Sequence, residues 1–262
     1  MTHILREQAN NKPVEVALTD GDTSYSWGEL ADVCEQAVQA LASLRLASGQ
    51  RVAVIARNAA PTAVVYLMAR FSGVQIVAAS FHLTAKEMAY ILNDANVGAV
   101  FCDESTRANV VAAAREVGIA HVFTIDGDAG SDGAQAFLPW VHAFDAVEPD
   151  LSVTAAPNVL YTSGTTGVPK GAVHTQAALL ANARASAWAH DFVEGDKVLS
   201  TLPMFHVGGL CIQTLPALLA GVQVVLHPRF DPTAWLDEMT TSRPSLSLLV
   251  PATMRAVFEH TR

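Results

Sequence analysis

Cysteine and basic residues are both scarce in this 262-residue sequence. The three cysteines, Cys34, Cys102 and Cys211, are widely spaced in apolar surroundings, so they indicate neither a disulfide framework nor a CxxC metal site. Basic residues number 16 against 25 acidic ones, and the net charge of -9 disfavours a nucleic-acid partner, because phosphate backbones are bound mainly by clustered Lys and Arg. This composition predicts a globular protein of a reducing, cytoplasmic environment.

Long uninterrupted apolar runs are also missing. The first eight residues lack the apolar core of a signal peptide, so we expect no secretion. Residues 198–228 contain no Asp, Glu, Lys or Arg, yet prolines, glycines and polar residues interrupt them well short of the roughly 20 apolar residues that a membrane span needs. We therefore expect a buried strand, helix and strand there and no transmembrane segment. The 51% hydrophobic content is ample for a large core.

Two common nucleotide-binding motifs are absent from the most glycine- and threonine-rich stretch. Five residues after Gly164 comes Pro169 and not glycine, so the G-x-x-x-x-G-K-S/T loop of P-loop NTPases is excluded. Thr166 stands where the second glycine of G-x-G-x-x-G would be, which excludes the dinucleotide-binding motif at this place.

The stretch itself, residues 161–171, reads Tyr-Thr-Ser-Gly-Thr-Thr-Gly-Val-Pro-Lys-Gly. A strand-like segment, 158–161, precedes it, and residues 173–190 have the composition of a helix, so we expect the loop to join a strand to a helix. Its glycines allow backbone N–H groups to turn toward an anion, its hydroxyls donate further hydrogen bonds, and Lys170 balances negative charge. This predicts a phosphate cradle, although such clusters are also typical of polar surface turns.

Strands and helices alternate along the rest of the chain. A hairpin is expected at 14–25, and the pairs Ser26/Glu29 and Thr84/Glu87 predict capping boxes that open helices. Further strands are expected at 51–56, 75–79, 98–102, 121–125, 198–202, 222–226 and 245–250, and further helices at 61–71, 106–117, 209–220, from 231 and 251–262. This pattern predicts an α/β fold of two stacked βαβ-type subdomains with mostly parallel sheets. The irregular stretch 127–158 predicts a boundary between residues 1–150 and residues 151–262.

Four segments in order carry a resemblance to one family. They are residues 81–94, the loop at 161–171, the segment Leu-Pro-Met-Phe-His-Val-Gly-Gly at 202–209 and Val-Pro-Ala-Thr at 250–253. Together they resemble the AMP-forming, adenylate-making ligases, which include acyl-CoA synthetases, firefly luciferase and the adenylation domains of peptide synthetases. The resemblance spans essentially the whole sequence.

The resemblance implies ATP, Mg²⁺ and coenzyme A as cofactor, metal and co-substrate. Residues expected to wrap the ATP phosphates are Thr162, Ser163, Gly164, Thr165, Thr166 and Gly167. Thr162 would also help to hold Mg²⁺, and Lys170 would approach the departing pyrophosphate. A carboxylate would attack the α-phosphorus of ATP to give an acyl-adenylate, and a thiol, commonly that of coenzyme A, would then capture the acyl group. Because two anions meet in the first step, charge neutralisation is the main demand.

The resemblance also implies that His206 lines the acyl pocket as a wall and not as a proton shuttle. A histidine among apolar residues is otherwise most often a packed one with a satisfied ring. Val207, Gly208 and Gly209 belong to the same expected pocket, where the two glycines would let a substrate lie against the backbone. The alternative for them is a plain helix entry.

The family's chains are much longer than this sequence. The segments that stack adenine, supply a glutamate for Mg²⁺, hold ribose and carry the C-terminal lysine are absent, so no residue here is given those roles. We expect a fragment that is inactive and binds ATP weakly alone. For the parent protein we expect a fatty- or aryl-acid:CoA ligase; the alternatives are a module that loads a carrier protein, a luciferase-like oxidising relative, or a non-catalytic stub. The acid and the oligomeric state are not indicated.

Overall fold

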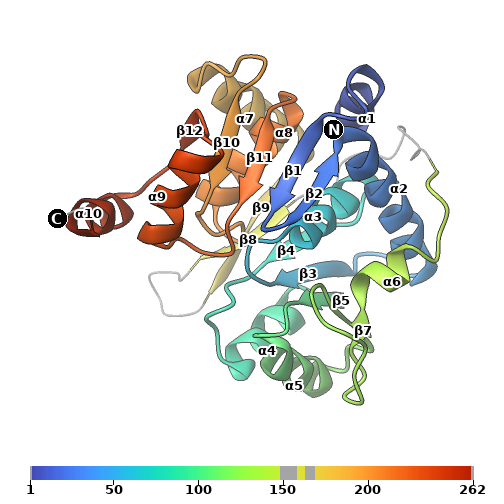
Figure 1. Cartoon of the computed structure of the whole chain (residues 1–262). Coiled ribbons are helices and arrows are strands. Elements are labelled where there is room, and N and C mark those ends of the chain that lie inside the picture. Colours follow the sequence, from blue (N-terminus) through green and yellow to red (C-terminus); the bar gives the residue numbers. More distant parts are fainter. Residues whose placement is uncertain (1, 148–157, 163–168, 261–262) are drawn as a thin grey trace.

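The computed structural model describes residues 2–147, 158–162 and 169–260. Two sheets, one of seven and one of five strands, form the body of the protein, with helices between and outside them (Figure 1). Most strand pairs are parallel, because strands and helices alternate along the sequence and each crossover places a helix on a sheet face. The α/β fold class predicted from the alternation is confirmed.

The seven-stranded sheet has the order β7-β6-β5-β3-β4-β8-β9. Its strands are β3 (Arg51–Ile55), β4 (Ile76–Ala78), β5 (Val97–Cys102), β6 (His121–Thr124), β7 (Gln135–Ala136), β8 (Asn158–Thr162) and β9 (Lys170–His174). Every neighbouring pair is parallel except β8 and β9, which are antiparallel. The carboxyl ends of β3, β4, β5 and β8 therefore lie at one edge of this sheet.

The five-stranded sheet has the order β12-β10-β11-β1-β2. Its strands are β1 (Val16–Asp20), β2 (Thr23–Ser26), β10 (Lys197–Ser200), β11 (Gln223–Leu226) and β12 (Leu246–Ser247). The predicted hairpin is present as β1 and β2, and Gly21 takes the positive φ, 56°, that its tight turn needs. Each sheet takes strands from both sides of residue 150, so the division proposed there does not coincide with a division between sheets.

Helices α2 (Trp27–Ser43) and α3 (Ala60–Ser72) lie between the two sheets, whereas α4 (Ala85–Asp94) and α5 (Arg107–Val117) cover the outer face of the seven-stranded sheet (Figure 1). The remaining helices are α1 (Thr2–Asn11), α6 (Phe137–Val141), α7 (Gln176–Ala189), α8 (Leu215–Leu219), α9 (Pro232–Thr241) and α10 (Pro251–His260). Both predicted capping boxes are present, at α2 and at α4. Of the helices in the described residues, none has the length and apolar character that crossing a bilayer requires.

Strand β3 shows why the central strands read as continuous apolar runs. Val52 and Val54 belong to the core shared with α2 and α3, while Ala53 and Ile55 belong to the core under α4 and α5. Successive side chains of a strand point to opposite faces, so a strand covered on both faces must be apolar at every position.

Three predicted elements differ from those in the structure. Residues 173–190 are not one helix: Lys170–His174 form β9 against β8, and α7 begins only at Gln176. The loop at residues 162–170, which is the phosphate loop of the sequence prediction, therefore joins two strands of a hairpin. The predicted helix 209–220 is divided into a π-helix, Gly208–Thr214, and α8. The strand expected at 245–250 is only two residues long, and the helix α1 had not been predicted.

Candidate functional site

The phosphate loop leaves the sheet at the edge where the carboxyl ends of β3, β4 and β5 also lie. In open parallel α/β sheets, ligands bind outside these carboxyl ends, where the strand order reverses. The chain runs from β3 to β4 on one side and then returns to β5 on the other side of β3, so this sheet has such a reversal. The edge is therefore where a ligand site is expected from topology alone.

Thr162 and Lys170 are the last cross-strand pair of the β8–β9 hairpin. Side chains of directly opposed residues lie on the same face of a sheet, so the Thr162 hydroxyl and the Lys170 ammonium flank the two ends of the loop together. Both residues are exposed. The other predicted phosphate ligands, Ser163, Gly164, Thr165, Thr166 and Gly167, lie outside the described residues.

A groove of about 870 Å³ lies where the carboxyl edges of the two sheets meet. Its walls are the segments that follow β3, β4 and β5 in one sheet and β10, β11 and β12 in the other: Arg57, Phe81, His82, Ser105, Thr106, Thr201, Leu202, Pro203, Pro228, Arg229, Phe230, Val250 and Thr253. Two arginines bring positive charge to an otherwise apolar and hydroxyl-bearing lining. Within the part of the chain that the structure describes, the buried Thr201 hydroxyl has no hydrogen-bond partner.

Asn58 ties one wall of the groove to the other. Its buried side chain donates to the Leu202 carbonyl at 2.9 Å and accepts from the Met204 N–H at 2.8 Å. Asn58 follows β3, and residues 202–204 follow β10, so a single amide fixes how the two sheets meet at the groove. It thereby sets the start of the segment that carries His206.

His206 and its neighbours occupy the turn between β10 and the π-helix. The His206 ring lies 4.3 Å from the Phe205 ring, and Phe205 meets Phe81 edge to face at 5.1 Å, so the turn adjoins the groove through aromatic contacts. Partial burial lowers the pKa of His206, which favours a neutral ring at pH 7. Val207 is 50% exposed. In the described chain, no hydrogen bond or ring contact joins His206 to Thr162 or Lys170.

The two glycines of this turn differ in what surrounds them. Gly208 is half-buried, and a Cβ there would meet only the end of the Leu202 side chain, at 3.3 Å. Gly209 is buried, and a Cβ there would meet the main chain of Leu202 and Pro203, with Pro203 O at 2.5 Å. The close approach at Gly209 is thus between two segments of the protein itself, which gives this glycine a packing role independent of substrate.

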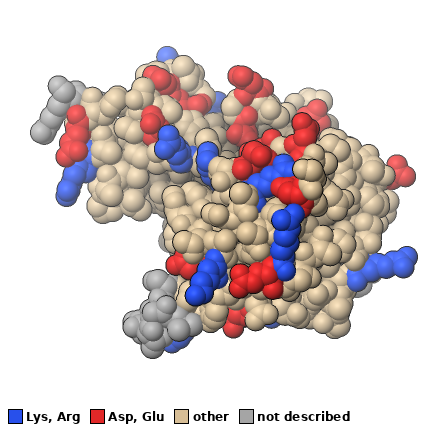
Figure 2. Space-filling view, turned by 90° about the horizontal axis from the view of Figure 1, so that it is seen from below, with Lys and Arg blue, Asp and Glu red and all other residues tan. Residues whose placement is uncertain are grey.

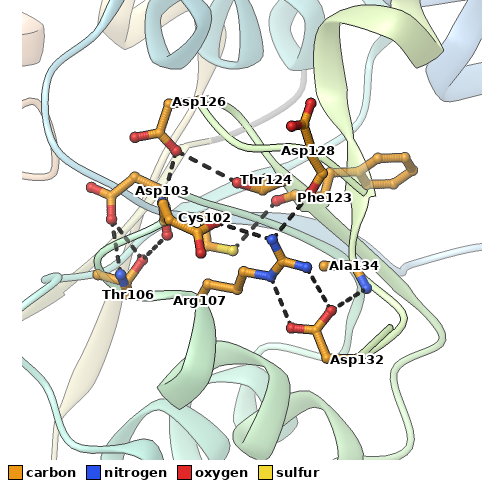
Figure 3. A network of polar contacts seen from close by, with 11 residues as sticks. Cys102, Asp103, Thr106, Arg107, Phe123, Thr124, Asp126, Asp128, Asp132 and Ala134 are labelled. Carbon is orange, nitrogen blue, oxygen red and sulfur yellow. Dashed lines mark hydrogen bonds and ion pairs between the residues drawn. The ribbon is translucent and has the colours of Figure 1, made fainter. Parts of the chain in front are cut away.

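A network of polar contacts holds Thr106, one of the residues that line the groove (Figure 3). Asp103 accepts from the Thr106 N–H at 2.9 Å and from the Arg57 N–H at 2.8 Å, so one carboxylate positions two groove residues. Arg107 makes a two-pronged contact with Asp132, at 2.8 and 2.7 Å. These bonds fasten the irregular segment after β6 to the start of α5.

The described residues hold no metal cluster, and the face drawn in Figure 2 shows no basic patch. Among residues 2–147, 158–162 and 169–260, no group of three or more His, Cys, Asp or Glu side chains could hold a metal ion. On the face shown in Figure 2, acidic and basic side chains are interspersed, and no continuous blue area appears.

Sequence reasoning missed Arg57, Asn58, Thr201 and Arg229 as site residues. A signal was present, because Arg57 and Asn58 follow directly after the strand that was predicted at 51–56. Thr201 and Arg229 follow strands of the other sheet, and their convergence with Arg57 depends on how the two sheets meet. Local sequence does not specify that arrangement.

Comparison with known proteins gives concordant results. The family described as "AMP-binding enzyme" matches residues 5–262. Indoleacetate–CoA ligase of Aromatoleum aromaticum is 34% identical over 97% of this chain and 50% of its own length, and sulfoacetate–CoA ligase of Cupriavidus necator is 32% identical over 83% and 43%. A putative long-chain-fatty-acid CoA ligase of Rhodopseudomonas palustris has the same fold, with a TM-score of 0.89 at 21% identity over 98% of this chain and 65% of the other. The chain spans about half the length of these curated relatives.

Proposed function

The chain belongs to the AMP-binding enzyme family, and we propose that it is part of a ligase that activates a carboxylic acid with ATP and transfers the acyl group to coenzyme A. The observation that carries the proposal is the Thr162–Lys170 pair, which holds a hydroxyl and an ammonium group on one face at the two ends of a glycine- and threonine-rich loop. That arrangement suits the phosphates of a nucleotide, because donors and positive charge converge from both ends.

In the first half-reaction, a carboxylate oxygen bonds to the α-phosphorus of ATP while the bond to the β-phosphate oxygen breaks and pyrophosphate leaves. Lys170 offsets the charge that develops on the leaving group. Thr162 offers a hydroxyl oxygen at the loop entry, which fits a place among the oxygen ligands of Mg²⁺; the metal, when bound, neutralises phosphate charge. In the second half-reaction, the thiol loses its proton, its sulfur bonds to the acyl carbon, and the bond from that carbon to the phosphate oxygen of AMP breaks so that AMP leaves.

We propose the groove and the adjoining turn as the place for the acid and the thiol co-substrate. The aromatic pair Phe81 and Phe205 and the exposed Val207 offer apolar surface for a fatty or aryl acid. Arg57 and Arg229 offer the charge that the phosphates of coenzyme A require. His206 fits a wall of this pocket, since a neutral ring neither repels an apolar acid nor needs a counter-charge. We propose a cytoplasmic location because coenzyme A and ATP are supplied there.

Two alternatives keep the same family. An adenylating module would pass the acyl group to a carrier protein, and a non-catalytic stub would keep the fold without turnover. Arg57 and Arg229 both line the groove and favour coenzyme A, because a free nucleotide co-substrate with several phosphates offers more negative charge to them than the single phosphate of a carrier-protein arm. We further propose that residues 1–262 alone bind ATP weakly. Tight ATP binding measured by calorimetry would contradict this proposal.

The proposal is tested by screening the complete parent protein against a panel of carboxylic acids, including fatty and aryl acids, with ATP and Mg²⁺. We expect pyrophosphate release that depends on one class of acid, and an acyl-thioester product only when coenzyme A is added. Release without any thioester would favour the carrier-protein module. Absence of acid-dependent release across the panel, in a folded protein, would contradict the ligase function.

A further inference from the structure

We propose that Tyr161 is a positioning residue: one anchored phenol ring holds both Thr162 and Lys170 in place at the ends of the phosphate loop. The inference rests on the proposed function, because it assigns to Tyr161 a part in ATP binding. Tyr161 lies in β8 directly before Thr162, and across the hairpin it is paired with Gly171, which directly follows Lys170. A single side chain is therefore adjacent to both loop ends.

The hydroxyl end of Tyr161 is fixed from outside the hairpin. It donates to the Asp94 carboxylate at 2.5 Å, a short contact of the kind that charge-assisted hydrogen bonds make. Burial, followed by this hydrogen bond, raises the pKa of Tyr161, so the hydroxyl keeps its proton and remains a donor. Asp94 is the last residue of α4, 67 positions away in the sequence.

The ring of Tyr161 fixes the second strand. A Cβ at Gly171 would lie 2.8 Å from Val159 and 3.2 Å from two ring carbons of Tyr161, so a larger residue there would require these side chains to move. The ring thus helps to set the position of the β9 backbone next to Lys170. Glycine at this position is explained by contact with Tyr161, since Gly171 is not among the residues with positive φ.

The segment that carries Asp94 is itself held in place. Arg51, at the start of β3, donates to the carbonyl of Ala95, next to Asp94, at 2.7 Å and to Gln75 Oε1 at 2.5 Å. On its inner face α4 is buried through Met88, Ile91 and Leu92. A carboxylate at a helix C-terminus opposes the helix dipole, so the helix gives no reason for Asp94, whereas the bond to Tyr161 does.

The consequence concerns ATP and not the acid. Without the hydroxyl anchor, the hairpin gains freedom at Thr162 and Lys170, and ordering them again on ATP binding costs affinity. We expect Tyr161→Phe in the complete parent enzyme to raise KM for ATP about fivefold, the loss of one hydrogen bond, with KM for the acid and the thermal midpoint nearly unchanged. Asp94→Ala should match it, and Asp94→Asn, which retains an acceptor oxygen, should have a smaller effect.

The matched control is Tyr90→Phe, the same change at an exposed tyrosine of α4; it should leave KM for ATP unchanged. The double variant Tyr161→Phe/Asp94→Ala should be no worse than either single variant, because both remove one bond. An unchanged KM for ATP in Tyr161→Phe, or a rise in both KM values together with a lower thermal midpoint, would overturn the proposal.

Hydrogen–deuterium exchange gives a readout that does not need turnover. Amides of 159–162 and 170–173 should exchange faster in Tyr161→Phe than in the parent and be unaffected in Tyr90→Phe. Unchanged exchange in Tyr161→Phe would overturn the positioning role even if the parent enzyme proved inactive. Faster exchange together with an inactive parent enzyme would support the positioning role of Tyr161 and contradict the ligase function.

Discussion

Asn58 and Leu202 are joined by a buried hydrogen bond across 144 positions of sequence, from the Asn58 amide to the Leu202 carbonyl at 2.9 Å. The same amide accepts from the Met204 N–H, so both polar ends of one side chain are used on a single turn. One residue follows a strand of the seven-stranded sheet and the other follows a strand of the five-stranded sheet. The bond therefore fixes the junction at which the groove and the His206 turn are built.

Replacing Asn58 by Ala should destabilise the protein markedly. The change leaves a buried carbonyl and a buried N–H without partners, and each such loss costs about 1–3 kcal/mol, so we expect a loss of roughly 2–6 kcal/mol in the free energy of unfolding. Urea denaturation measures it. Asn93→Ala, at an exposed position of α4, is the control and should change stability by less than about 0.5 kcal/mol. Equal effects of the two variants would show that the Asn58 bonds carry no stability.

Gly209→Ala and Gly208→Ala form a matched pair of neighbouring substitutions. The Cβ at Gly209 would meet rigid main chain of Leu202 and Pro203, whereas at Gly208 it would meet only a flexible Leu202 methyl group. We expect Gly209→Ala to lower the free energy of unfolding by about 1–3 kcal/mol, as overpacking does, and Gly208→Ala to have a smaller effect. A crystal structure or denaturation series showing the reverse order would contradict this account of the turn.

The elements predicted from sequence are those whose signals are local. The capping boxes at Ser26 and Thr84 need only residues three positions apart, and the central strands can be recognised from their unbroken apolar runs. Strand β9 was missed because Lys-Gly-Ala-Val-His merges in sequence with the alanine-rich helix that follows it, and only pairing with β8 distinguishes the two.

The features of the candidate site also divide into those with a local sequence signal and those without one. The loop at 162–170 could be predicted to bind phosphate from its glycines and hydroxyls, because they form one continuous string, and this role stays a prediction. The π-helix at Gly208–Thr214 could not be predicted, since its wide turn is stabilised by neighbours: Asn182 donates to the Cys211 carbonyl and Ser186 donates to the Ile212 carbonyl, both from α7. The position of Asn58 after a strand could be predicted, but its role could not, because its two partners lie in a segment that only the fold brings near.

The Arg107–Asp132 pair predicts a pH-dependent difference between variants (Figure 3). Hydrogen bonds from Arg107 lower the pKa of Asp132 to about 2, from an ordinary value of 3.8. Because the pKa of Asp132 is lower in the folded state, its ionised carboxylate stabilises the protein at pH values above 3.8. This stabilisation is lost as the pH falls from 3.8 toward 2. In Arg107→Lys the two-pronged contact is lost, so the Asp132 pKa should rise, as measured by NMR of its carboxyl carbon.

Stability should follow the same dependence. Arg107→Lys should have a lower free energy of unfolding than the unsubstituted protein at neutral pH. This difference should shrink as the pH falls and Asp132 becomes protonated. The control is Arg184→Lys, at an exposed position of α7, where no such pH dependence is expected. A stability difference for Arg107→Lys that persisted unchanged down to pH 2 would show that the contact does not act through the ionised carboxylate.

His206 should titrate below the ordinary value of 6.5, because partial burial lowers its pKa. Protonation is then disfavoured in the folded state, so this residue reduces stability as pH falls below 6.5, where the unfolded chain binds the proton first. The measurement is the ring-proton shift against pH, with the urea-unfolded protein as reference and His206→Gln for assignment. A folded-state midpoint above that of the unfolded chain would contradict the neutral pocket wall and favour a charged role.

Lys170→Ala tests the charge at the loop exit in the complete parent enzyme. Loss of a charge-assisted hydrogen bond, about 1.5–3 kcal/mol, should slow adenylation roughly ten- to a hundredfold, measured by acid-dependent pyrophosphate exchange. Because the ammonium is required during the first half-reaction, thioester formation from a preformed acyl-adenylate should be nearly unaffected. Lys86→Ala, an exposed lysine of α4, is the matched control for the loss of one positive charge. If exchange were unchanged, or if both half-reactions slowed equally, Lys170 would act on the fold and not on the departing pyrophosphate.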